Sequence, residues 1–329
     1  MKTCRILSLL LMLPVFALMG CEGDQGPPGP AGPAGTDGCV ECHNGTNIIS
    51  GKLIQWEESG HGTGESYVRG TRSSCAGCHS GNAFREMIAA GLNPGSGESG
   101  DPNPTRQDCR ACHMVHEGDE YDSSDWALQS VAPVAFYADA GGTFDGGTGN
   151  LCVNCHQPRR VIPEPVEGVI SGISSHWGPH HGPQSSMLMG RVGAGSTVGS
   201  PSGHYTLVTD TCNGCHMGEG ADHTFEPDTD RCQECHGEVD DFDINDRQTN
   251  TAALINQLGE LLLAAGLIDE NGPDGHPIVS EAPENQAIAL WNWLYVAHED
   301  KSLGVHNPAY SQALLEEGIA LMQPAGASR

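Results

Sequence analysis

The chain has 329 residues and a formal net charge of −27, with 42 acidic against 15 basic side chains. So acidic a chain repels a phosphate backbone, which excludes nucleic-acid binding through phosphate contacts. Hydrophobic residues make up only 37% and aromatic residues 5%, beside 45 Gly and 21 Pro. Because an ordinary soluble domain has more apolar side chains to bury, this composition predicts a core filled in part by something else.

The N-terminal residues 1–20 have the layout of a secretory signal, with two basic residues followed by a short apolar stretch. The sequence "LMGC" that ends at Cys21 resembles a bacterial lipobox. We therefore expect a lipoprotein-type signal and a lipid anchor at Cys21, with an ordinary cleaved signal as the alternative. A transmembrane helix is disfavoured because Pro14 interrupts the stretch, which is shorter than the roughly 20 apolar residues that a span needs.

Residues 21–38 continue from this anchor as "CEGDQGPPGPAGPAGTDG", with Gly at every third position from 23 to 38. This Gly-X-Y period is typical of collagen, but the segment is short for a stable triple helix. We interpret it as a semi-extended tether that lifts the folded part away from a membrane, with a trimerising element as the alternative.

Six CxxCH motifs follow, and they contain 12 of the 14 cysteines. CxxCH is the attachment sequence of c-type haem, in which two thiols form thioethers with one porphyrin and the histidine binds the iron. Zinc sites and disulfide scaffolds also use cysteine pairs, but neither explains a histidine after every second cysteine. The predicted attachment residues are Cys39, Cys42, Cys75, Cys78, Cys109, Cys112, Cys152, Cys155, Cys212, Cys215, Cys232 and Cys235, with iron ligands His43, His79, His113, His156, His216 and His236.

Six covalent haems in residues 39–247 leave little polypeptide for each macrocycle. The predicted fold is mostly irregular loops with short α-helices, wrapped around a packed chain of six haems, with amphipathic C-terminal helices and little β structure. Haems packed this closely would form a path for electrons.

Ten histidines lie outside the motifs and are candidates for the second axial ligand of each iron. The run "HWGPHHGPQ" at 176–184 holds three of them, and the adjacent His180 and His181 could serve two neighbouring haems. The predicted distal ligands are His61, His116, His180, His181, His223 and His306, with His204 and then His176 in reserve. Histidine on every iron predicts low reduction potentials, since His/Met ligation is the arrangement that raises them.

The C-terminal segment 248–329 has a different pattern, with apolar residues at helical spacing in 250–268, 284–299 and 307–322. Three amphipathic helices are predicted to pack on the haem region. Asn307 is expected to cap the last helix and Pro308 to be its first residue, which would hold His306 just ahead of a rigid element.

The chain resembles the multihaem c-type cytochromes of the outer-membrane or extracellular kind found in metal-reducing bacteria. The resemblance rests on the six motifs and on "HWGPHHGPQSSMLMG", "CHMGEGADHTFEPDTDRCQECH" and "EDKSLGVHNPAYSQALLEEG". The segment "GVHNP" is also similar to the distal-ligand segment of ammonia-forming nitrite reductases, which supports His306 as a ligand.

This resemblance implies an electron carrier rather than an enzyme with catalytic residues. It implies an outer-membrane, cell-surface or extracellular place, without excluding the periplasmic face, and partners such as other cytochromes or extracellular metals and minerals. Some hexahaem members form filaments, so a homo-oligomer is a further possibility. The alternative is a multihaem reductase of nitrite, hydroxylamine or a sulfur oxyanion, which requires a haem with an open coordination site.

Overall fold

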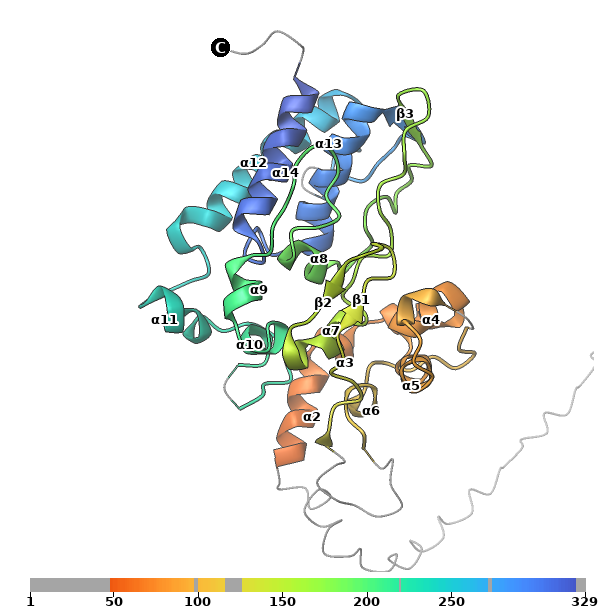
Figure 1. Ribbon diagram of the computed structural model, residues 1–329, viewed down its shortest axis with the longest axis vertical. Coiled ribbons are helices and arrows are strands. Elements are labelled where there is room, and N and C mark those ends of the chain that lie inside the picture. Colours follow the sequence, from red (N-terminus) through yellow and green to blue (C-terminus); the bar gives the residue numbers. More distant parts are fainter. Residues whose placement is uncertain (1–47, 98–99, 116–125, 219, 272–273, 324–329) are drawn as a thin grey trace, which may run out of the picture.

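The computed structural model describes residues 48–97, 100–115, 126–218, 220–271 and 274–323 (Figure 1). The predicted signal, the tether and the first CxxCH motif fall within residues 1–47 and so lie outside the described residues, as does His116.

The first two thirds of the described chain consist of short helices joined by loops. The longest of these helices, α2 (Ile48–Glu58), has 11 residues, and most of the others have between four and nine. The remaining α-helices are α3 (Gly60–Thr63), α4 (Ser73–His79), α5 (Gly81–Ala89), α6 (Cys109–Cys112), α7 (Asn150–Val153), α8 (Gln184–Leu188), α9 (Gly203–Leu207), α10 (Cys212–His216) and α11 (Asp230–His236). Short 3-10 helices occupy Ser66–Thr71, Pro94–Ser96, Gly147–Gly149 and Ile244–Asp246.

Two small antiparallel ribbons form the β structure of the described residues. Strand β1 (Val134–Ala135) pairs with β2 (Thr143–Phe144), with Val134 opposite Phe144. Strand β3 (Val169–Ser171) pairs with β4 (Glu281–Pro283), which joins the middle of the chain to its C-terminal part.

The C-terminal part holds three long helices that pack against one another, α12 (Arg247–Ala264), α13 (Glu284–Leu294) and α14 (Pro308–Met322). A π-helical turn, Tyr295–Asp300, continues α13. Asn307 caps α14 by accepting a hydrogen bond from the backbone N–H of Tyr310, and Pro308 is the first helical residue, as predicted. Figure 1 shows these helices side by side at one end of the molecule.

The main hydrophobic core lies among these helices. Trp291, Trp293 and Tyr295 are fully buried there. The same core takes residues from the middle of the chain, including Ile170 and Met187, before the predicted boundary at 248. The fold class predicted from the sequence is confirmed: short helices and loops, longer C-terminal helices and little β structure.

No helix in the described part of the chain is both long enough and apolar enough to span a membrane.

Candidate functional site

Each CxxCH motif that the structure describes lies on a short helix or a helical turn. Helices α4, α6, α10 and α11 contain both cysteines of a motif, and α7 leads into the turn that completes the fourth. In the third and fourth motifs the histidine N–H donates to the first cysteine's carbonyl, at 2.8 Å for His113 and 2.9 Å for His156. One helical turn brings both thiols to one face, because residues three apart are neighbours on a helix. All ten thiols of these five motifs are free of disulfide bonds.

Every motif histidine in the described residues is paired with one histidine from outside the motifs. The ring centroids of each pair lie between 6.1 and 6.4 Å apart, and the interplanar angles range from 27° to 77°. The pairs are His79 with His180, His113 with His223, His156 with His61, His216 with His306, and His236 with His204.

This separation fits one metal atom held between two imidazoles. Two metal–nitrogen bonds of about 2 Å, with about 1.2 Å from each Nε2 to its ring centre, place the centroids about 6.4 Å apart. The varied interplanar angles also fit, because both rings can rotate about the shared axis without losing either bond. The other histidine–histidine ring contacts among the described residues are shorter, 5.4 Å between His180 and His181 and 5.7 Å between His276 and His298.

Most of the paired rings have their Nδ1 atom fixed by an oxygen acceptor. Because these oxygens only accept, Nδ1 must carry the proton, which leaves the lone pair of Nε2 for a metal. The acceptors are the carbonyls of Trp126 for His113 (2.9 Å), Phe225 for His216 (2.8 Å), Val305 for His204 (2.6 Å) and Ala221 for His223 (2.7 Å), the Gln184 amide for His156 (3.0 Å) and the Asp300 carboxylate for His306 (2.7 Å).

Burial also keeps some of the paired imidazoles in the neutral form. It lowers the pKa of His61 to about 4, helped by His156, and lowers the pKa of His180 to about 4, helped by Arg159. Both rings are therefore neutral near pH 7, which is the form that binds a metal. His306 differs: burial alone would lower its pKa, but the charge and hydrogen bond of Asp300 outweigh burial and raise it.

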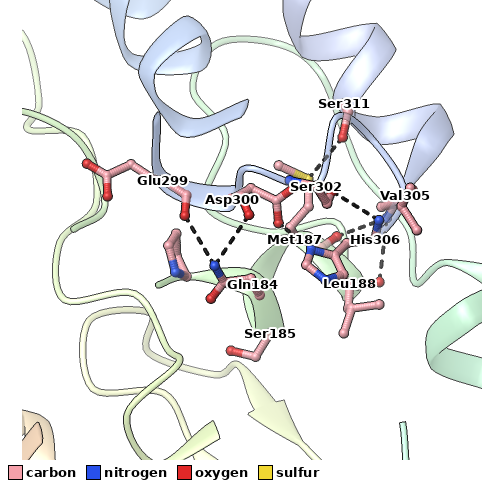
Figure 2. Close-up of polar contacts among 12 residues, drawn as sticks. Gln184, Ser185, Met187, Leu188, Glu299, Asp300, Ser302, Val305, His306 and Ser311 are labelled. Carbon is pink, nitrogen blue, oxygen red and sulfur yellow. Dashed lines mark hydrogen bonds and ion pairs between the residues drawn. The ribbon is translucent and has the colours of Figure 1, made fainter. Parts of the chain in front are cut away.

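A network around α8 connects the fourth motif to the turn that holds His306, and Figure 2 shows its part around Gln184, Asp300 and His306. Gln184 accepts from Nδ1 of His156 through Oε1 and donates through Nε2 to the carbonyls of Glu299 and Asp300, both at 3.3 Å. The Asp300 side chain in turn accepts from His306. One amide thus links the motif histidine of the fourth site to the turn that orients the partner histidine of the fifth.

Asn307 connects the start of α14 to α8 and to the loop at Ser200. Its Nδ2 donates to the carbonyls of Met187 (3.1 Å) and Ser200 (3.0 Å), while its Oδ1 caps α14. His306 therefore sits between a fixed helix N-terminus and the Asp300 carboxylate, which is fully buried.

The structure pairs four of the predicted distal ligands, His61, His180, His223 and His306, with motif histidines. His181 instead places Nδ1 3.0 Å from Oε2 of Glu299, and 70% of its side chain is exposed. The neighbouring His180 has a backbone φ of +85°, the glycines at 178 and 182 also have positive φ, and the His180 ring centroid lies 5.4 Å from that of His181.

His204, held in reserve in the sequence, pairs with His236. The other reserve, His176, is exposed, and its carbonyl accepts from Arg160. Sequence reasoning did not identify Gln184 and Asp300 as supporting residues. The only signal was their place within "HWGPHHGPQ" and just ahead of "GVHNP".

The comparison with known proteins rests on solved structures. No protein-family model and no curated protein matches the chain. The structure of the outer cell wall cytochrome OcwA superposes with a TM-score of 0.52 at 20% identity, over 83% of this chain and 50% of OcwA. The chain has the fold of that cytochrome. It spans about half of OcwA's length, and the resemblance seen in the sequence is confirmed at the level of the fold.

A second solved structure is an undecahaem cytochrome from the S-layer of Carboxydothermus ferrireducens. It has a TM-score of 0.45 at 18% identity, and the match covers 76% of this chain and 38% of that one.

Proposed function

We propose that this protein is a hexahaem c-type cytochrome that carries electrons through closely packed haems with two histidine ligands each. The observation that carries the proposal is the set of five histidine pairs. Each has one member in a CxxCH motif and a centroid separation of 6.1 to 6.4 Å, which suits a single iron between the rings. Free thiols in the same motifs supply the groups that would attach each porphyrin.

The protein's residues would bind and orient the cofactor. The two cysteines of a motif would attach the porphyrin, and the motif histidine and its paired histidine would both bind the iron. Haem, when bound, supplies an iron that exchanges single electrons. The hydrogen bonds at Nδ1 fix each ring's tautomer and direction. Because such a carrier forms no bond with a substrate, no catalytic residue is required.

The sixth haem of the proposal belongs to the motif Cys39–His43, and His116 and His181 remain proposed distal ligands. The predicted signal and the lipid anchor at Cys21 would place the protein on the outer membrane, at the cell surface or outside the cell. OcwA is named as an outer cell wall cytochrome, which supports an extracellular place for this chain. Other cytochromes, metal or mineral acceptors, or further copies in a filament are the proposed partners.

Low-temperature electron paramagnetic resonance on the oxidised, haem-loaded protein tests the proposal. We expect only low-spin signals that nitrite leaves unchanged, together with a mass that corresponds to six attached haems. A high-spin signal altered by nitrite would instead indicate an open site and favour a reductase of nitrite, hydroxylamine or a sulfur oxyanion.

A matched pair of variants assigns the ligands. His204→Ala removes a paired histidine, so we expect one haem to become high-spin. His276→Ala removes a histidine that contacts His298 and no described motif histidine, so the spectrum should not change. Equal spectra for the two variants would contradict the pairing.

A further inference from the structure

The fourth motif, Cys152–His156, touches three other motifs. The second motif reaches it through Cys78, whose Sγ lies 3.9 Å from the carbonyl oxygen of Asn154, inside the fourth motif. The side chains of Cys78 and Cys155 are also neighbours. These two motifs are separated in sequence by the whole of the third.

The fifth motif meets the fourth on the side of its first cysteine. Sγ of Cys152 lies 3.6 Å from Oδ1 of Asn213, which stands between the two cysteines of the fifth motif. Asn213 also donates through Nδ2 to Thr148 at 2.8 Å, just ahead of α7. The second and fifth motifs therefore approach opposite ends of the same CxxC segment.

The third motif meets the fourth through a small apolar cluster of Phe84, Ala111 and Leu151. Cys112 and Cys155 both pack against this cluster. Ala111, inside the third motif, is 1% exposed, so the two motifs are in close contact rather than separated by solvent.

The helix that carries the sixth motif, α11, contacts the fifth motif. Nε of Arg231, on α11, donates to the carbonyl of Gly214 at 3.0 Å, and Gly214 lies inside the fifth motif. Figure 1 shows the same order in space: α7 is central, α4, α6 and α10 surround it, and α11 lies beyond α10.

Contacts between these motifs translate into contacts between cofactors. A thioether would join each cysteine to its porphyrin, so motifs that contact one another would bring two porphyrins close together. Electron exchange falls steeply with distance, and such neighbours exchange electrons fastest.

We propose that the fourth haem is the junction of a branched network, with the second, third and fifth haems as its neighbours and the sixth as an extension of the fifth. This inference rests on the proposed function. In this network the haems do not form one linear chain in sequence order; they form arms that meet at the fourth haem. An electron that enters by one arm could leave by either of the others, and such traffic would cross the haem held by His156 and His61.

Iron positions in the haem-loaded full chain, located by anomalous scattering or cryo-electron microscopy, test the network directly. We expect the fourth iron to have the second, third and fifth as its three nearest neighbours among the irons of the described motifs. If the histidine pairs hold the irons but the fourth iron lacks one of these neighbours, the junction is wrong and the proposed function stands. If the pairs hold no iron, the proposed function itself fails.

Kinetics provides a second test with a matched control. His61→Met and His204→Met each exchange one distal histidine for methionine, which raises the potential of one haem. At the junction such a haem traps electrons, so after flash photoreduction His61→Met should redistribute them between arms about tenfold more slowly for each 59 mV of increase.

His204→Met alters the sixth haem, at the end of an arm, and we expect it to slow redistribution between the arms less than His61→Met does. The control therefore separates passage through the junction from a general effect of methionine ligation. Equal slowing in the two variants would overturn the junction.

Discussion

The C-terminal helices and the motif-bearing region obtain their cores in different ways. The C-terminal core is continuous and includes Leu258, Leu290, Trp291 and Trp293, all fully buried. The motif-bearing region has two small clusters, one around Phe136 and Phe144 and one around Phe84 and Leu151. Side-chain packing therefore accounts for the first region and is insufficient for the second.

This difference indicates where the cofactor enters the folding energy. A region with few buried apolar side chains has little to offset the loss of conformational entropy. When a cofactor is held in the folded state and not in the unfolded state, its binding energy becomes folding energy. Haem is thus expected to be a structural requirement for the motif-bearing region and not for the C-terminal helices.

The largest predicted effect follows from removing haem altogether. In protein produced without haem attachment, we expect rapid amide hydrogen exchange throughout α2 to α7 and α9 to α11. Helices α12, α13 and α14 should stay protected, because their core consists of side chains. Uniform protection along the haem-free chain would contradict the comparison, and the haem-loaded protein serves as the reference.

Trp293→Ala tests the C-terminal core in the haem-loaded protein. Trp293 is fully buried and donates through Nε1 to the carbonyl of Ile255 at 2.9 Å. We expect a loss of about 3–5 kcal/mol in the free energy of unfolding, measured by denaturant titration of the helical signal. Ile278→Ala, at a side chain that is 61% exposed, should cost about 0.5 kcal/mol or less. A haem spectrum changed by Trp293→Ala would show that the two regions are coupled.

Asp300→Asn tests the contact between the two regions. With haem bound as proposed, the buried carboxylate would make His306 a stronger electron donor, which would stabilise Fe(III) and lower the potential of the fifth haem. Its amide replacement should raise that potential by on the order of 50 mV, equivalent to roughly 1 kcal/mol for one electron. Spectroelectrochemical titration measures the shift.

Glu316→Gln is the control, because it removes one negative charge from an exposed position on α14. Its titration should match that of the unaltered protein. A shift of similar size in both variants would attribute the effect to net charge rather than to the hydrogen bond with His306.

The smallest effect is expected at Glu317, which links α14 to the loop at 196–197. Burial alone would raise its pKa, but hydrogen bonds from Ser196 and Thr197 outweigh burial and lower it. A lowered pKa means that the stabilisation is complete above the unfolded-state value and is lost as the pH falls through the folded-state value. Glu317→Gln should cost less than about 1 kcal/mol at pH 7, because solvent screens a partly exposed group.

The pH dependence distinguishes this contribution from simple loss of a contact. Denaturation of the variant at pH 7 and at pH 3 should give a smaller difference than in the unaltered protein. An identical difference would show that the ionisation of Glu317 makes no contribution to stability.

Local patterns were the parts of this molecule that could be predicted. Each CxxCH motif contains its own predicted histidine ligand, because all five residues lie within about one helical turn. The apolar spacing predicted the three C-terminal helices, and Asn307-Pro308 predicted where the last begins. The predicted helix ends were less accurate. The helix predicted to end at 268 ends at Ala264, and the one predicted to end at 299 changes to a π-helical turn at Tyr295.

The sequence by itself determined the kind of site, the number of motifs and the surplus of histidines. Only the tertiary structure decided that His204 rather than His181 meets a described motif histidine, and that the fourth motif touches three others. The physical reason is range. A motif's chemistry is encoded within a few residues, whereas the partner of each ring depends on how distant loops pack, on a positive φ at His180 and on a half-buried amide at Gln184.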